Sequence, residues 1–225
     1  KSTVVSLLAY LANSLGVNAQ LGGNIGQPVL DIFTKETTGE NTCLPALLIL
    51  ELSSFQLETL CSMQAIATSV LNVSDDHLDR HQSMENYQCI KQRIYPQGKL
   101  AIINRDDKGT NVVNKSQPVL SFGSDVPTKN QFGVTQINGK ATLAFAEQNL
   151  ITLNELPLAG MHNALNYLAA LALGYSAGWP LTAMVNSLTG FTGLAHRCQK
   201  IVSDDGITWI NDSKATNVGA TIAAI

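Results

Sequence analysis

The chain has 225 residues, and its 14 Lys and Arg residues against 17 Asp and Glu residues give a formal net charge of −3. This balance argues against a nucleic acid as the main partner, because neutralising phosphates requires a basic surface. Hydrophobic residues make up 45% and charged residues 14% of the chain, which excludes intrinsic disorder. No apolar run reaches the roughly 20 residues that span a bilayer, so no membrane partner is expected.

The first half of the chain alternates helical and strand patterns. The expected helices span residues 2–15 and 83–95, and the expected strands span residues 17–21, 46–52, 65–72 and 99–104. The strands at 46–52 and 65–72 are continuous apolar runs, which are typical of strands covered on both faces. Strands that alternate with helices predict an α/β fold with a doubly wound, mostly parallel sheet.

The second half begins with a different pattern. Residues 132–137 and 140–145 flank Asn138-Gly139, a strong hairpin signal, which predicts a small antiparallel unit attached to the parallel sheet. The remaining expected elements are helices at 160–174 and 180–188 and strands at 199–202 and 208–211. The Gly- and Thr-rich connector at 189–195 marks a domain boundary, so we expect one domain over residues 1–192 and the beginning of a second over 193–225.

The four cysteines indicate a reducing compartment. They are Cys43, Cys61, Cys89 and Cys198, and no two of them form a C-x-x-C pair. Four cysteines in a chain of this length do not make a disulfide framework. We therefore expect reduced thiols in a cytoplasmic protein.

The first three residues, Lys1-Ser2-Thr3, stand directly before an apolar helix. They match the end of a phosphate loop, G-x-x-x-x-G-K-[ST], in which the Lys reaches phosphates and the hydroxyl contacts Mg²⁺. The alternative is an ordinary helix start. We expect that the chain is cut inside this motif, with the loop glycines and the preceding strand missing.

Charged residues follow the two buried strands. Glu51 ends the first strand, where open α/β sheets bind ligands, and it is either a Mg²⁺ ligand or a cap of the helix that begins near Ser53. The segment at 71–81 follows the second strand, with His77 as its best candidate; the alternative is a polar helix start capped by Ser74 or Asp75.

Polar residues on four other segments are further candidates. Lys91, on the helix that follows His77, has the pattern of an ordinary solvated lysine. Asn163 and Asn166 share one helix face, which fits either recognition of a polar ring or helix capping. Further along, Arg197 is a candidate phosphate clamp and Asp212 a candidate ribose ligand.

Taken together and in order, these segments resemble the Mur ligases, ATP-dependent amide-forming enzymes of peptidoglycan synthesis. The segments are K-S-T at 1–3, GGNIG at 22–26, ELSSFQLE at 51–58, LNVSDDHLDRH at 71–81, HNALNYLAAL at 162–171, GLAHR at 193–197 and NDSKATN at 211–217. ELSSFQLE and NDSKATN are most similar to the members that add D-glutamate. The resemblance implies a central ATPase domain of P-loop type, followed by the start of a Rossmann-like domain.

The resemblance also implies roles for individual residues. Lys1, Ser2 and Thr3 would bind ATP phosphates, while Asn163, Asn166, Arg197 and Asp212 would bind adenine, ribose and phosphate. Ser2, Glu51, His77 and a carbamylated Lys91 would hold two Mg²⁺ ions. Asn24 would contact the muramoyl substrate, and Lys214 and Thr216 would line the place where acyl phosphate and amino acid meet.

The implied substrates are ATP, UDP-N-acetylmuramoyl-L-alanine and D-glutamate, and the implied enzyme is a monomer. Two alternatives remain open at this point. The chain is part of another Mur-type or folylpolyglutamate-type amide ligase, or it is a nucleotide-binding module without turnover.

Overall fold

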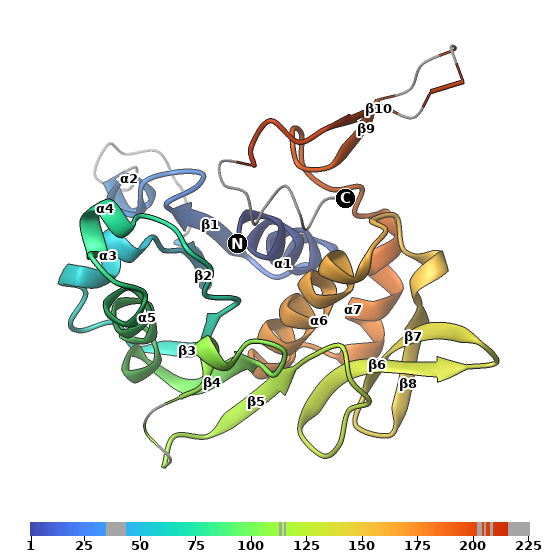
Figure 1. Ribbon diagram of the computed structural model, residues 1–225, viewed down its shortest axis with the longest axis horizontal. Helices are drawn as coiled ribbons and strands as arrows, with labels where there is room; N and C mark the ends of the chain where they lie inside the picture. Colours follow the sequence, from blue (N-terminus) through green and yellow to red (C-terminus); the bar gives the residue numbers. More distant parts are fainter. Residues whose placement is uncertain are drawn as a thin grey trace.

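The computed structural model describes residues 1–34, 44–112, 114, 116–201, 204, 206–207 and 209–215, and these form an α/β fold (Figure 1). The helices are α1 (Ser2–Ser14), α2 (Val29–Thr34), α3 (Ser54–Thr59), α4 (Leu78–His81), α5 (Met84–Gln92), α6 (Met161–Ser176) and α7 (Leu181–Ser187). The strands are β1 (Ala19–Gly23), β2 (Leu47–Glu51), β3 (Ala65–Val70), β4 (Gly98–Asn104), β5 (Val119–Phe122), β6 (Gln131–Ile137), β7 (Lys140–Phe145), β8 (Gln148–Thr152), β9 (Gln199–Ile201) and β10 (Trp209–Asn211).

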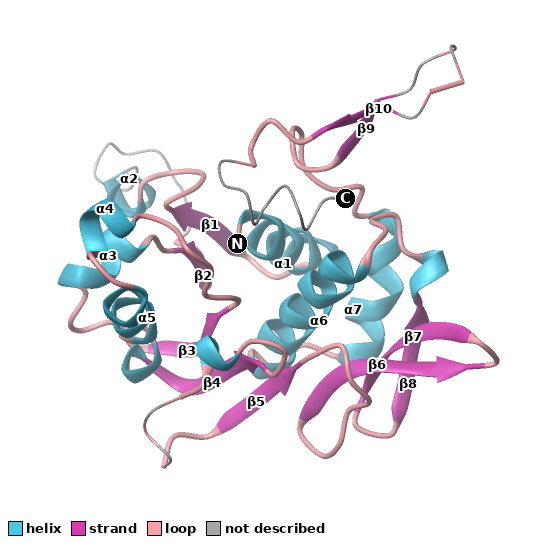
Figure 2. Ribbon diagram, viewed as in Figure 1, coloured by secondary structure: helices cyan, strands magenta, loops and turns pink. Residues whose placement is uncertain are grey.

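The main sheet has six strands in the order β3-β4-β5-β6-β7-β8 (Figure 2). The pairs from β3 to β6 are parallel, and the pairs β6–β7 and β7–β8 are antiparallel. This confirms the expected mostly parallel α/β sheet with an antiparallel unit. The unit continues the parallel sheet through the short β5–β6 ladder, which pairs Ser121 with Gln131 and Phe122 with Phe132.

The predicted hairpin is present between β6 and β7. Asn138 and Gly139 have φ angles of 51° and 75°. Two consecutive positive φ values fit the type I′ turn, whose twist matches that of the flanking strands. This turn sets the register that pairs Ile137 with Lys140.

The first two strands form a separate parallel sheet. β1 pairs only with β2 among the described strands, and β2 and β3 share no backbone ladder. Both β2 and β3 line one cavity of about 1000 Å³. The single continuous sheet that the alternating pattern predicts is thus divided at this cavity.

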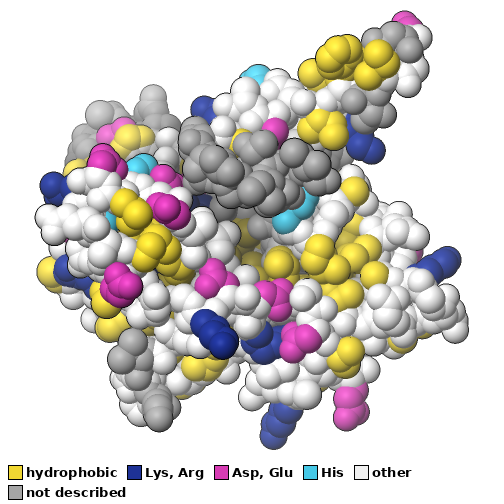
Figure 3. Space-filling model, viewed as in Figure 1, with side chains coloured by type: hydrophobic (Ala, Val, Ile, Leu, Met, Phe, Trp, Pro, Cys, Tyr) yellow, Lys and Arg dark blue, Asp and Glu magenta, His cyan; other side chains and the backbone are white. Residues whose placement is uncertain are grey.

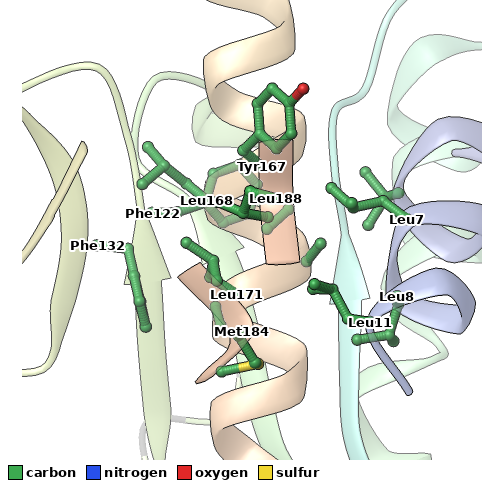
Figure 4. Close-up of a cluster of buried hydrophobic side chains, with 14 of the residues drawn as sticks. Leu7, Leu8, Leu11, Phe122, Phe132, Tyr167, Leu168, Leu171, Met184 and Leu188 are labelled. Atoms are coloured by element: carbon green, nitrogen blue, oxygen red, sulfur yellow. The ribbon is translucent and has the colours of Figure 1, made fainter. Parts of the chain in front are cut away.

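The core lies between the main sheet and α1, and α6 runs through its middle (Figure 4). Leu7 and Leu11 of α1 face Leu168 and Leu171 of α6, and Phe122 of β5 packs from the other side. Six consecutive residues of α6, 167–172, are buried. A helix that is buried all round needs small and apolar side chains on every face, which accounts for the Ala- and Leu-rich sequence here.

The last described strands form a hairpin-like sheet of their own. β9 and β10 pair antiparallel, close to the two strands expected at 199–202 and 208–211. Their side chains Ile201, Trp209 and Ile210 are about half exposed, at 49%, 50% and 54%. Hydrophobic side chains gather on this hairpin in Figure 3.

Two further expectations concern the surroundings of the protein. None of the helices in the described part of the chain is long and apolar enough to cross a membrane. Cys61, Cys89 and Cys198 are free thiols, and Cys43 lies outside the described residues.

Candidate functional site

Most of the predicted site residues line the cavity between β2 and β3. They are Lys1, Ser2, Asn24, Glu51, His77, Lys91, Arg197 and Lys214. They come from segments that are far apart in sequence, from Lys1 at one end of the described chain to Lys214 near the other. The carboxyl ends of parallel strands are the usual ligand-binding edge of an open α/β sheet, and this cavity includes them.

Glu51 is a buried carboxylate with one free oxygen. It is only 5% exposed, and Oε1 accepts a hydrogen bond from Asn24 Nδ2 at 3.3 Å. Oε2 is buried and has no hydrogen-bond partner. A buried carboxylate oxygen without a donor is costly unless a cation or another ligand satisfies it.

The alternative role of Glu51, as a helix cap, is wrong. Ser53 is the N-cap of α3, and its hydroxyl accepts from the backbone N–H of Gln56 at 3.3 Å. The Gln56 side chain accepts in return from the N–H of Ser53, which completes a capping box. The Glu51 carboxylate is therefore free to face the cavity.

A glycine allows the loop after β1 to lie against Glu51. Gly23 has a φ of +101°, and a Cβ built on it would lie 2.4 Å from the carbonyl oxygen of Glu51. The next residue, Asn24, donates its backbone N–H to that same oxygen at 2.7 Å. The glycine-rich loop therefore positions Asn24 beside the carboxylate.

Gly23→Ala is expected to separate this loop from β2, because both the positive φ and the contact with Glu51 exclude a side chain. We expect a loss of folding stability of about 1–3 kcal/mol, measured by urea unfolding. Gly139→Ala is the matched control, since its φ is also positive but a Cβ there meets nothing within 4 Å. Equal losses in the two variants would show that the Glu51 contact contributes nothing.

His77 stands at the start of α4 in a left-handed conformation, with a φ of 54°. Its Nε2 lies 3.7 Å from Asp76 Oδ2, and its ring lies 5.1 Å from that of Phe55. No side chain caps α4, so neither Ser74 nor Asp75 has the capping role that was the alternative for this segment. The His77 side chain is 47% exposed and lines the cavity.

The sequence pattern of Lys91 alone indicated a solvated lysine. In the structure its side chain is instead directed at the residues that follow β3. Its Nζ donates to the carbonyl oxygen of Asn72 at 2.7 Å and lies 4.8 Å from the centre of the Tyr87 ring. Burial lowers the pKa of Lys91 to about 8, helped by the positive charge of Lys1 and opposed by Asp107 and Asp76. A much larger share of the amine is neutral near pH 7 than in an ordinary lysine.

The start of α1 meets the connector after α7. Arg197 Nη2 donates to Ser2 Oγ at 2.8 Å, and Ser2 is buried. Lys1, Ser2 and Arg197 line the same cavity as Glu51.

The other predicted residues are not gathered in the cavity. Asn163 Nδ2 donates to the carbonyl oxygen of Ala159 at 2.8 Å, and Asn166 Nδ2 donates to Asn163 Oδ1 at 3.2 Å. These are local hydrogen bonds but not a helix cap, because the N-cap of α6 is Gly160 and no side chain caps this helix. Asp212 accepts from the backbone N–H of Cys198 at 3.1 Å.

Two predicted residues remain without a place in the site. Thr3, on the first turn of α1, does not line the cavity. Thr216 lies outside the described residues.

The sequence did not single out a second histidine near the cavity, which, unlike His77, is buried. His81 is 1% exposed, and its Nε2 lies 2.9 Å from Ser54 Oγ. It stands four residues after His77, so both come from the same polar segment. That spacing is the one sequence signal that connects them.

The described residues do not form a complete cation site by themselves. Nowhere among them do three or more His, Cys, Asp or Glu side chains come together as metal ligands. A cation beside Glu51 would therefore need oxygen atoms from water, a hydroxyl, a phosphate or a modified lysine as well.

Comparisons with known proteins agree with this fold. The family profile described as "Mur ligase middle domain" matches residues 1–174. The chain is similar to the UDP-N-acetylmuramoylalanine–D-glutamate ligases of Colwellia psychrerythraea, at 60% identity, and Pseudomonas fluorescens, at 43%. Each match covers 100% of this chain, and it covers 48% and 49% of those two relatives. The chain thus spans about half the length of the relatives it matches.

Solved structures show the same architecture. The structure of a UDP-N-acetylmuramoyl-L-alanyl-D-glutamate–2,6-diaminopimelate ligase is 25% identical with a TM-score of 0.69, over 91% of this chain and 47% of that one. A pseudomurein peptide ligase type C from Methanothermus fervidus shares the fold alone, at 16% identity and a TM-score of 0.71, over 100% of this chain and 54% of that one. With its profile match over most of its length and its fold, the chain belongs to the Mur ligase middle-domain family.

Proposed function

We propose that this chain is part of an ATP-dependent ligase that joins D-glutamate to UDP-N-acetylmuramoyl-L-alanine. The relatives at 60% and 43% identity carry the name of that activity. The observation that supports the chemistry best is the unpartnered Oε2 of Glu51, in a cavity that Lys1, His77 and Lys91 also line. In the proposed arrangement, residues 1–192 form the central ATP-binding domain and residues 193–225 begin the next domain.

The nucleotide would bind at the start of α1. Lys1, Ser2 and Thr3 would contact its phosphates, and Arg197 would exchange its bond to Ser2 for a phosphate oxygen. Adenine and ribose would lie against Asn163, Asn166 and Asp212. This last step requires the Asn163–Asn166 pair to open toward the ligand, since the two side chains bond each other here.

The residues that would hold two Mg²⁺ ions are Ser2, Glu51, His77 and Lys91. The chemistry of Glu51 fits this role, because its free carboxylate oxygen is a hard, anionic ligand. When bound, Mg²⁺ neutralises negative charge on phosphate and carboxylate oxygens. The ammonium form of Lys91 cannot be a ligand, so its part in the site depends on a modification.

Lys91 would carry that modification as a carbamate. The lone pair of the neutral amine attacks the carbon of CO₂, a nitrogen–carbon bond forms, and one proton leaves to solvent. The pKa of about 8 favours this step, because it makes neutral amine available near pH 7. The product has two carboxylate-like oxygens at the end of β3, where Nζ now bonds Asn72.

The proposed reaction needs positioning more than a nucleophilic side chain. The terminal carboxylate of the UDP-sugar would attack the γ-phosphorus of ATP, the bond from that phosphorus to the bridging oxygen would break, and an acyl phosphate and ADP would result. The amine of D-glutamate then attacks the acyl carbon, an amide bond forms, and phosphate leaves. Lys1 and Arg197 would screen the meeting anions, Asn24 would orient the acyl substrate, and Lys214 with Thr216 would line the attack position.

A ligase of the relatives' length that contains residues 1–225 is expected to release phosphate from ATP only when both partner substrates are present. The rate with D-glutamate and UDP-N-acetylmuramoyl-L-alanine should be about 100-fold or more above the rate with diaminopimelate or L-alanine in place of D-glutamate, or with a folate in place of the UDP-sugar. Steady-state phosphate release with each substrate pair measures this. A faster rate with another substrate pair would identify a different Mur-type or folylpolyglutamate-type ligase, and no release at all would indicate an inert nucleotide-binding module.

We also propose that the enzyme is a cytoplasmic monomer.

A further inference from the structure

A buried hydrogen-bonded pair connects the two segments that carry Glu51 and His77. His81 Nε2 lies 2.9 Å from Ser54 Oγ, and the two residues are 1% and 7% exposed. Ser54 is the first residue of α3, three positions after Glu51 at the end of β2. His81 is the last residue of α4, whose N-cap is His77.

Further contacts fix both the backbone and the ring of His81. Its backbone N–H donates to the carbonyl oxygen of His77 at 3.0 Å, which closes the single turn of α4. Its ring is stacked between the rings of Phe55 and Tyr87, at 5.6 Å and 5.1 Å. Phe55 also touches the His77 ring, so α3 contacts both histidines of this segment.

The charges around His81 determine which atom of the pair donates. Its Nδ1 is buried without a hydrogen-bond partner and lies 3.5 Å from Glu58 Oε1. Glu58 is itself bound by Arg80 at 2.7 Å, which keeps it anionic. A proton on Nδ1 faces this carboxylate favourably, so Nε2 is the acceptor and the Ser54 hydroxyl donates to it.

With its proton committed to His81, the Ser54 oxygen presents only lone pairs to the cavity, which Ser54 lines. It can then accept a hydrogen bond from a metal-bound water, but it cannot donate one to a phosphate or a carboxylate. Such outer partners fix the geometry of metal ligands and commonly change metal affinity by about 10- to 100-fold when removed.

We propose that His81 is a positioning residue, which, through Ser54, fixes the distance between Glu51 and His77 and so sets the affinity for the divalent cation. This inference rests on the proposed function, in which those two residues hold Mg²⁺. Stacking alone would need only an aromatic ring at position 81, whereas the proposal requires a hydrogen-bond acceptor there. The two explanations differ in what a phenyl or an amide side chain would do.

The test uses a ligase of the relatives' length with Mn²⁺ as a spectroscopic probe. Mn²⁺ binding is measured by electron paramagnetic resonance in the presence of a non-hydrolysable ATP analogue, and folding is measured by thermal unfolding. His81→Phe keeps the stacking and removes the acceptor, and Ser54→Ala removes the donor without adding volume. Both variants are expected to weaken Mn²⁺ binding by about tenfold. The double variant is expected to bind Mn²⁺ no more weakly than whichever single variant has the lower affinity.

Two variants serve as controls. His81→Gln places an amide oxygen near the position of Nε2. Its Mn²⁺ affinity is expected to lie within about threefold of that of the enzyme without substitutions. Lys99→Ala removes an exposed lysine of β4 that does not line the cavity and is expected to leave Mn²⁺ binding unchanged. Folded Ser54→Ala protein with unchanged Mn²⁺ affinity would overturn the proposal, even if His81→Phe failed to fold.

A further variant separates this inference from the function on which it rests. If His77→Ala weakens Mn²⁺ binding and Ser54→Ala does not, the metal site stands and only the role of His81 is wrong. If His77→Ala itself leaves Mn²⁺ binding unchanged, the proposed metal site is wrong, and the positioning role is overturned with it.

Discussion

Lys91→Ala in a ligase of the relatives' length is expected to lower kcat by about 100- to 1000-fold, because it removes the two carbamate oxygens that would stabilise a Mg²⁺ ion beside the acyl substrate. The side chain is well placed for this loss to be specific. Its Nζ contacts the Asn72 carbonyl at 2.7 Å and the face of Tyr87, so it is held at the end of β3. Steady-state phosphate release with saturating substrates measures the effect.

Short carboxylic acids are expected to restore part of this activity. Acetate or formate fits the space that the lysine leaves and supplies oxygens to the cation. Lys99→Ala is the matched control, since Lys99 is an exposed lysine on β4 that does not line the cavity, and neither its activity nor its response to acetate should change. Near-normal activity of Lys91→Ala would mean that the carbamate assignment is wrong.

The lowered pKa of Lys91 adds a pH dependence to this prediction. Only the neutral amine reacts with CO₂, so after removal of CO₂ the rate of reactivation at a fixed CO₂ concentration should rise with pH. The rise should level off above the pKa of about 8, and not above the ordinary value of 10.5. A ¹³C carbamate signal that appears with ¹³CO₂ and is absent from Lys91→Ala would confirm the product.

The parts of the fold with strong local signals were predictable from the sequence. The β6–β7 hairpin follows from Asn138-Gly139, and α6 follows from its long apolar pattern. β5 and β8 were missed because each is short and their pairing is decided by neighbours in the sheet, not by their own sequences. The predicted helix over 83–95 was too long, since α5 ends at Gln92 and a separate turn at Tyr95–Gln97 includes Pro96.

The candidate site was predictable where its residues lie at or after the ends of buried strands. Glu51 and His77 follow apolar runs, and in an α/β pattern that position by itself indicates a ligand-binding edge. The environment of Lys91 was not readable, because its partner is a backbone carbonyl 19 positions away. The burial of His81 was equally hidden, since its stacking and its bond to Ser54 join residues from separate segments, 27 positions apart in the case of Ser54.

The buried Glu51 carboxylate accepts one hydrogen bond, from the side-chain amide of Asn24. Replacing this carboxylate therefore tests whether its negative charge serves folding or cation binding. Oε1 is bonded to Asn24 at 3.3 Å and Oε2 is unpartnered, so the apo fold gains little from the negative charge. Burying an unpaired charge costs free energy. Losing that charge should therefore leave folding stability unchanged or raise it.

Glu51→Gln is thus expected to raise the Mg²⁺ concentration for half-maximal activity by about 100-fold, with no loss of stability. The amide keeps the volume of the side chain and an oxygen for Asn24, but it lacks the charge that a divalent cation requires. Measuring the rate against Mg²⁺ concentration, together with urea unfolding, separates a ligand from a structural residue. His77→Ala should shift the Mg²⁺ dependence in the same direction, and its exposed ring predicts little effect on folding. A Glu51→Gln protein that loses several kcal/mol of stability and keeps its Mg²⁺ dependence would show that the carboxylate is structural, because its charge would then be compensated by the protein and not by a cation.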